Sequence, residues 1–69
     1  TGVSIELVNK NDRPVRGVTI KVTTPSNFEY TVENGKVVRK VNTRDGKIYY
    51  ISTDLPAMGT RVVSLRAKI

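Results

Sequence analysis

The sequence predicts an all-β domain, and three features of the chain indicate this fold class. Apolar and polar residues alternate with a period of two along most of the 69 residues, as in half-buried strands. Clusters of turn-forming residues interrupt the alternation about every 8–12 residues. No segment shows the apolar period of roughly 3.6 residues that is typical of a helix. Together these features predict a small antiparallel sandwich or barrel of about six or seven strands.

The first two strands are predicted on either side of a polar turn. Residues 3–8 alternate between apolar and more polar side chains, and the segment NKNDRP at 9–14 ends this strand because it is rich in turn formers. Residues 18–23 alternate again, with Thr and Lys on the outer face. The loop TPSN at 24–27 follows, and a third strand is predicted from Phe28 to Val32.

Two Gly-containing turns are predicted in the middle of the chain. Asn34-Gly35 lies between two β-rich runs and is the preferred pair for a two-residue hairpin, in which both residues have a positive φ. Asp45-Gly46 repeats this signature before a strand at 48–52, although NTRDGK leaves room for a longer loop. The sequence therefore predicts two successive hairpins.

The C-terminal segment DLPAMGTRVVSLRAKI predicts a connection followed by a closing strand. Pro56 cannot donate a hydrogen bond to a sheet, and Gly59 permits a backbone turn. From Arg61 onward the residues alternate again. The predicted core of the domain consists of Ile5, Leu7, Val18, Ile20, Val22, Tyr30, Val32, Val63 and Leu65, and Phe28 is expected to contribute to it.

Length and composition restrict the possible functions. Sixty-nine residues form a single domain at 1–69, and a start at Thr1 predicts a fragment or processed piece of a larger protein. Cys, His and Trp are absent, which excludes disulfides, thiolate metal sites and His-based catalysis. No run approaches the roughly 18 apolar residues of a membrane span.

The ionisable residues favour an interaction surface over a catalytic site. Each of the six Asp and Glu residues has a ready role in a turn or on a solvated strand face, so we expect no catalytic pair, metal or cofactor. The 12 Lys and Arg residues give a net charge of +6, which raises the possibility of an anionic partner. The candidate basic surface comprises Lys21, Arg39, Lys40, Arg66 and Lys68. Tyr49 or Tyr50 is expected beside it, available for stacking.

The segment DGKIYYISTDLPAMGTRVVSL resembles the closing strands of non-catalytic β-sandwich domains attached to glycoside hydrolases. It is most similar to the class II α-mannosidase type, and ENGKVVRKV is similar to a hairpin of the same domains. Thr60 stands where that family usually has Tyr, and its Asn-Pro-Leu opening is absent. Immunoglobulin-like cell-surface repeat modules of microbes are nearly as close, and carboxypeptidase-regulatory-like sandwiches share Pro14-Val15-x-Gly17-Val18.

The resemblance implies an immunoglobulin-like accessory module that is not itself an enzyme and carries no catalytic residues. Its parent would be a carbohydrate-active or cell-surface protein, which implies an extracytoplasmic setting. Its partner would be a neighbouring domain or subunit, or else a polyanion or carbohydrate. Two alternatives stay open from the residues themselves: a small basic β-barrel that binds nucleic acid, and a fibre or coat subunit that assembles by strand pairing.

Overall fold

The computed structural model describes residues 2–25 and 27–68, which form strands and no helix. Period-two alternation accounts for these strands, because it gives each of them one apolar side to bury. In chain order, the strands are β1 (Gly2–Val8), β2 (Val15–Thr24), β3 (Tyr30–Glu33), β4 (Lys36–Asn42), β5 (Lys47–Leu55) and β6 (Thr60–Ala67).

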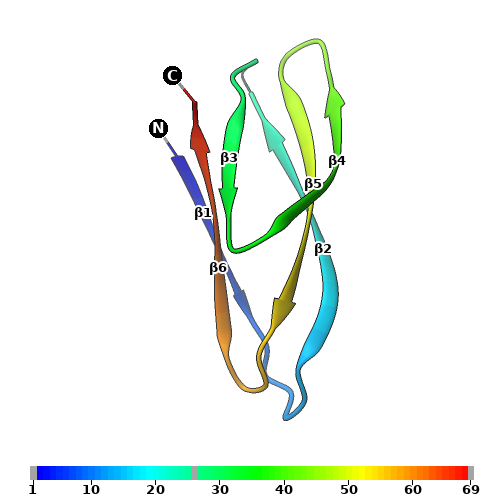
Figure 1. Ribbon diagram of the computed structural model, residues 1–69, viewed down its shortest axis with the longest axis vertical. Coiled ribbons are helices and arrows are strands. Elements are labelled where there is room, and N and C mark those ends of the chain that lie inside the picture. Colours follow the sequence, from blue (N-terminus) through cyan, green and yellow to red (C-terminus); the bar gives the residue numbers. More distant parts are fainter. Residues whose placement is uncertain (1, 26, 69) are drawn as a thin grey trace.

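The strands form two antiparallel sheets that face each other (Figure 1). One sheet has the order β1-β6-β3 and the other the order β2-β5-β4. The body is elongated, with principal extents of 41 × 20 × 14 Å. Gly2 pairs with Arg66, so the first and last strands meet at the end of the molecule that carries both termini. The structure confirms the predicted all-β sandwich and has six strands.

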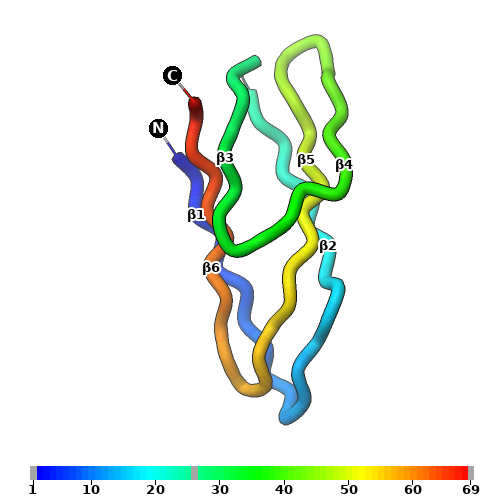
Figure 2. Tube along the Cα trace, in the orientation of Figure 1, coloured from blue at the N-terminus to red at the C-terminus, as the bar shows by residue number. Residues whose placement is uncertain are grey.

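Consecutive strands pair with each other only at β4 and β5, within the described residues, and the other connections cross between the sheets (Figure 2). The hairpin predicted at Asp45-Gly46 is confirmed, and its loop is longer than two residues. The Thr43 N–H donates to the Gly46 carbonyl at 2.8 Å, and the Thr43 hydroxyl bonds both backbone groups of Gly46.

The hairpin predicted at Asn34-Gly35 is wrong, because β3 pairs with β6 whereas β4 pairs with β5. Asn34 has a φ of 64°, but its side chain donates to the Val62 carbonyl of β6 at 2.9 Å. Its own carbonyl accepts the Thr53 hydroxyl of β5 at 2.8 Å. A Cβ on Gly35 would lie 2.6 Å from Ile51 Cγ2. The pair therefore carries the chain across the sandwich and joins the two sheets.

The core lies between the sheets and depends on the two central strands, β5 and β6. Among the predicted core residues, Val22, Val63 and Leu65 are buried. The half-buried Ile5, Leu7, Ile20, Tyr30 and Val32 pack against them, and Val18 is also half-buried. Tyr49, Ile51 and Leu55 are buried but were absent from the prediction.

The aromatic residues are distributed differently from the prediction. Phe28 is 56% exposed, so its expected core role is wrong. Tyr49 takes a core position instead and meets Tyr30 edge to face, with ring centroids 5.9 Å apart. Tyr50 points to the outer face because β5 alternates between buried and half-buried residues along its length. Of the two tyrosines proposed for stacking, Tyr50 is the one accessible from outside.

At the end of the sandwich opposite the termini, the β1–β2 loop and the β5–β6 connection lie side by side (Figure 2), and the buried Asn9 joins them. Its side-chain amide donates to the carbonyls of Arg13 and Pro56 at 2.9 and 3.0 Å. Its side-chain oxygen accepts the Asn11 N–H at 3.0 Å, and its backbone N–H donates to the Gly59 carbonyl at 2.8 Å. One side chain thus fastens the β1–β2 loop to the β5–β6 connection, and we name this arrangement the Asn9 lock.

Candidate interaction surfaces

The five basic residues predicted as one surface lie in several parts of the sandwich. Lys21 and Arg39 share the outer face of β2-β5-β4, where both stand opposite Tyr50. Lys40 stands opposite the buried Tyr49, on the inner side of the same sheet. Arg66 lies on the other sheet, and Lys68 follows the end of β6. The structure therefore brings Lys21 and Arg39 together and separates them from the other three.

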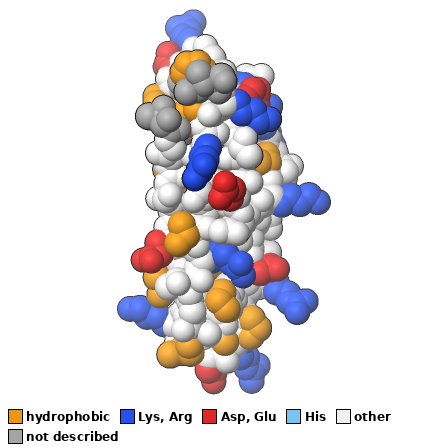
Figure 3. Space-filling model, turned by 60° about the vertical axis from the view of Figure 1, so that its left-hand side comes forward, with side chains coloured by type: hydrophobic (Ala, Val, Ile, Leu, Met, Phe, Trp, Pro, Cys, Tyr) orange, Lys and Arg blue, Asp and Glu red, His pale blue; other side chains and the backbone are white. Residues whose placement is uncertain are grey.

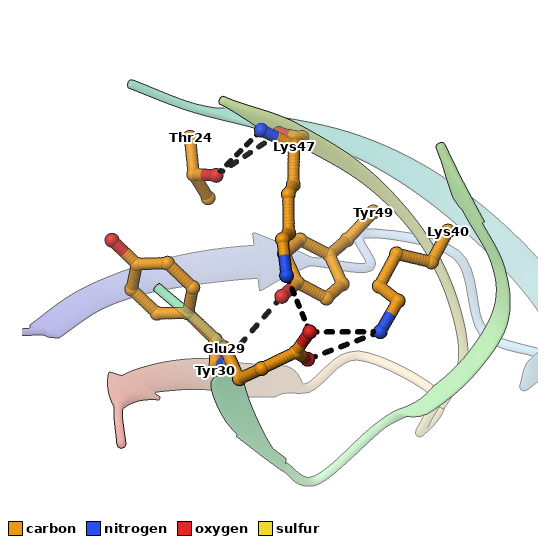
Figure 4. A network of polar contacts seen from close by, with 6 residues as sticks. All are labelled: Thr24, Glu29, Tyr30, Lys40, Lys47 and Tyr49. Carbon is orange, nitrogen blue, oxygen red and sulfur yellow. Dashed lines mark hydrogen bonds and ion pairs between the residues drawn. The ribbon is translucent and has the colours of Figure 1, made fainter. Parts of the chain in front are cut away.

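Lys40 belongs to an ionic cluster that joins the two sheets (Figure 4). Glu29, just before β3, accepts hydrogen bonds from the ammonium groups of Lys40 and Lys47. The closer Lys40 contact is 3.0 Å. The Lys47 side chain is only 11% exposed, whereas that of Glu29 is 49% exposed. We name these three residues the Glu29 clamp, and their geometry assigns them to holding β3 against the opposite sheet.

The clamp controls the ionisation of Glu29. Hydrogen bonds from Lys47 and then from Lys40 lower the pKa of the Glu29 carboxyl from 4.5 to about 2, since both stabilise the charged form. Glu29 is therefore ionised at every pH above that value. In this state the Glu29 carboxylate compensates the positive charge of the mostly buried Lys47. It is poorly suited to donating or accepting a proton near neutral pH.

Polar groups around the clamp also have structural partners. The Thr24 hydroxyl donates to the Lys47 carbonyl at 3.0 Å and accepts the Lys47 N–H at 3.2 Å. The Tyr49 hydroxyl accepts the Tyr30 N–H at 3.2 Å. Within the described chain, no buried side-chain nitrogen or oxygen lacks a partner. This end of the sandwich is therefore a satisfied polar network, which is expected of a structural site.

An irregularity in β4 decides which of its cations face outward. The register shifts between Val37 and Arg39, so Val38 is an extra residue opposite β5. Such a bulge changes the face on which the following residues lie. Lys36 and Arg39 consequently share the outer face, opposite Ser52 and Tyr50 respectively, whereas Lys40 faces inward. Lys36, which was not among the predicted surface residues, joins the candidate surface for this reason.

The outer face of β2-β5-β4 is a basic surface with an aromatic centre. The strand registers place Lys21, Tyr50 and Arg39 in one row across the sheet. The Arg39 guanidinium lies over the Tyr50 ring, 5.6 Å from its centroid. We name this surface the basic face; it consists of Thr19, Lys21, Thr23, Lys36, Arg39, Val41, Ile48, Tyr50 and Ser52. These residues include three cations, and the nearest carboxylate on the same side of the sheet is that of Asp54, two residues beyond Ser52 in β5.

The outer face of the other sheet has a different charge balance. Arg66 lies 3.9 Å from the Glu33 carboxylate, and Glu6 lies on the same face opposite Val62. The cation on this face is therefore offset by two acids. Figure 3 shows side chains of both signs scattered over the visible surface. The basic face therefore differs from this face in having three cations that belong to none of the ion pairs found among the described residues.

Apolar side chains are exposed near the end that carries the Asn9 lock, and Figure 3 shows hydrophobic groups at the lower end of the molecule. Val8 is 52% exposed, Val62 40% and Met58 70%. The register pairs Val8 with Thr60, so Val8 and Val62 are diagonal neighbours on one face. Met58 has a φ of 51°, and its N–H donates to the Asn11 carbonyl at 2.8 Å. We name these three residues the tip patch.

A small, mostly apolar cavity of about 210 Å³ lies near the termini and is lined by Gly2, Val3, Pro25 and Tyr30. Among residues 2–25 and 27–68, no three Asp or Glu side chains gather into a possible metal site. The same residues contain no helix long and apolar enough to cross a membrane. The two exposed surfaces, basic face and tip patch, are therefore the candidate functional sites.

Comparison with known proteins does not assign the chain to a family: no family model, no curated protein and no solved structure matches it.

Proposed function

We propose that this chain is a non-catalytic interaction module of a larger carbohydrate-active or cell-surface protein, and that it packs against a neighbouring domain or subunit. The tip patch is the observation that supports this proposal. Met58, Val8 and Val62 form an apolar surface on a backbone that is already fixed by the Asn9 lock. A preorganised apolar surface loses little conformational entropy when a partner covers it.

The order of the strands supports the immunoglobulin-like part of the proposal. In immunoglobulin domains, strands B, E and D are neighbours in one sheet, and C, F and G in the other. Here β2-β5-β4 has the first arrangement and β3-β6 has the C-F pairing. The first strand, β1, lies beside β6 in the place of G. In this arrangement β4 and β5 correspond to the neighbouring strands D and E, which agrees with the hairpin that joins them.

Hydrogen–deuterium exchange tests the packing proposal. Amide exchange is measured for the isolated chain and for the same chain in its native assembly. We expect slower exchange in the assembly at residues 56–62, because a partner covers the tip patch. Unchanged exchange in this segment would contradict the proposal.

A variant pair tests the same contact by its chemistry. Met58→Gln with Val62→Thr makes the tip patch polar without a large change in volume, and should weaken association in the assembly. Val38→Thr is the matched control, because Val38 is 56% exposed but lies on the bulge of β4. Equal weakening by both variants would show that the tip patch is not the contact.

A further inference from the structure

The basic face has unbalanced charge, and this property is independent of the packing proposed for the tip patch. Lys21, Lys36 and Arg39 take part in none of the ion pairs found among the described residues. Asp54 follows Ser52 on the outward side of β5, at the edge of the basic face, and its carboxylate accepts the Gly17 N–H at 3.0 Å. Three cations on one small surface attract anions and favour a partner with several negative charges.

The centre of the face carries a cation–π pair of two planar groups. Arg39 covers the Tyr50 ring at 5.6 Å, and the neighbouring row consists of Thr19, Ser52 and Lys36. Thr19 and Ser52 have short side chains, so the row beside the Arg39–Tyr50 pair carries little bulk on the β2 and β5 side. Guanidinium planes and tyrosine rings are the side-chain groups on which unstacked bases rest.

The spacing of the cations suits an extended polymer. Neighbouring strands are about 4.8 Å apart, so the Cα atoms of Lys21 and Arg39, which lie on either side of β5, are about 10 Å apart. Lys36 lies about 7 Å from Arg39 along the strand direction, because the register separates their β5 partners by two residues. Lys21 and Lys36 thus lie on different sides of the Arg39–Tyr50 pair, and the three cations do not form a compact pocket for a single small anion.

We infer that the basic face binds single-stranded nucleic acid. Phosphates would pair with Lys21, Lys36 and Arg39, while a base would stack on the Arg39–Tyr50 pair. A sulfated polysaccharide supplies the negative charges, but its saturated rings have no π-face to stack on the guanidinium of Arg39. A duplex hides its bases, and this flat face has no helix or ribbon to enter a groove. A single-stranded nucleic acid can contact the cations through its phosphates and the Arg39–Tyr50 pair through a base.

Fluorescence anisotropy with labelled 12-nucleotide oligo-dT and oligo-U tests this inference. Three phosphate contacts on a single strand predict a logarithmic salt slope of about −2, so affinity should fall roughly 20-fold between 50 and 200 mM salt. Lys21→Gln should reduce the slope by about 0.7. Tyr50→Leu should weaken binding by roughly 5- to 150-fold, since it removes one stacked base, whereas Tyr50→Phe should bind like the parent chain.

Matched charge variants separate the basic face from the net charge of the molecule. The triple variant Lys21→Gln, Lys36→Gln, Arg39→Gln should abolish binding. The control Lys10→Gln, Arg13→Gln, Arg66→Gln removes the same three charges elsewhere and should retain most of the affinity. Circular dichroism establishes that each variant is folded before binding is compared.

Three results would overturn the inference. Equal loss of affinity in the two triple variants would assign binding to net charge alone. Binding of a sulfated polysaccharide without binding of either oligonucleotide would assign the face to a carbohydrate partner. Absence of oligonucleotide binding at 50 mM salt would remove the nucleic-acid partner altogether.

Discussion

The two ends of the sandwich are closed by different polar clusters, one ionic and one formed by a neutral amide. At the end near the termini, the Glu29 clamp joins the sheets through charges. At the far end, the Asn9 lock joins two loops through the hydrogen bonds of a neutral amide. Asn9 is 4% exposed, whereas the Glu29 side chain is 49% exposed. A neutral amide can be buried at lower cost than an ionised carboxylate, so each end uses the group that its exposure permits.

The difference implies that solution conditions act on the ends separately. Hydrogen bonds of an amide do not change with pH, whereas an ion pair weakens when its carboxylate is protonated or when salt screens it. Acid should therefore loosen the clamp and leave the lock intact. Substitutions at the two ends should therefore respond differently to pH, and a substitution in the core between them gives the loss of stability with which both can be compared.

The largest effect is expected in the core between the two ends. Leu65→Ala removes a buried side chain of the central strand β6, which is 1% exposed, and should lower the free energy of unfolding by about 2–5 kcal/mol through lost burial and a residual cavity. Urea denaturation at pH 7 measures this loss. A near-neutral result would contradict the inward orientation of Leu65.

The Asn9 lock should give the next largest effect. Asn9→Ala leaves the Arg13 and Pro56 carbonyls without their buried donor and the Asn11 N–H without its acceptor. We expect a loss of about 2 kcal/mol, which should stay constant between pH 3 and 7. Asn11→Ala is the matched control, because the hydrogen bonds found for Asn11 use its backbone. If both variants lose the same stability, the Asn9 side chain is not the fastening group.

The Glu29 clamp should give the smallest effect and the only one that depends on pH. The pKa of Glu29 is about 2 in the folded chain against 4.5 without its partners. The stability that it contributes is therefore complete above pH 4.5 and is lost as the pH falls toward 2. Glu29→Gln should be less stable than the parent chain at pH 7, and the difference should shrink as the pH approaches 2.

Thermal melting of the parent chain and Glu29→Gln at pH 7, 4.5, 3 and 2 measures the contribution of the clamp. Glu33→Gln serves as the control, since its ion pair with Arg66 is longer and both side chains are well exposed. A difference between the parent chain and Glu29→Gln that stays constant from pH 7 to 2 would show that the clamp does not titrate as described.

The fold class could be predicted from the sequence because alternation is a local property. The Asp45-Gly46 hairpin was also predictable, since β4 and β5 remain neighbours in space. Asn34-Gly35 carries the same local signal, yet the strands on its two sides pair with different partners. Which sheet a strand joins depends on contacts far apart in the sequence, and a turn signature does not contain that information.

The candidate surface was only partly predictable for a related reason. The prediction placed the adjacent Arg39 and Lys40 on one surface, but neighbouring strand residues face opposite ways, and the bulge at Val38 turns Arg39 outward and Lys40 inward. Val37 and Val38 are adjacent and chemically identical, so the sequence gives no local sign of the extra residue. Tyr49 and Tyr50 are adjacent and chemically identical, so only the register with β2 and β4 decides which one is buried.

The pairing of Gly2 with Arg66 has a consequence for how the module can be joined to other chains. Any polypeptide attached before β1 or after β6 leaves from the same end of a body that is 41 Å long. The domain could therefore be inserted into a surface loop of another protein without separating the two points of insertion. In that arrangement it would stand out from its host as an arm, with the β1–β2 loop and the β5–β6 connection at its outer end and Lys21, Lys36 and Arg39 on its flank.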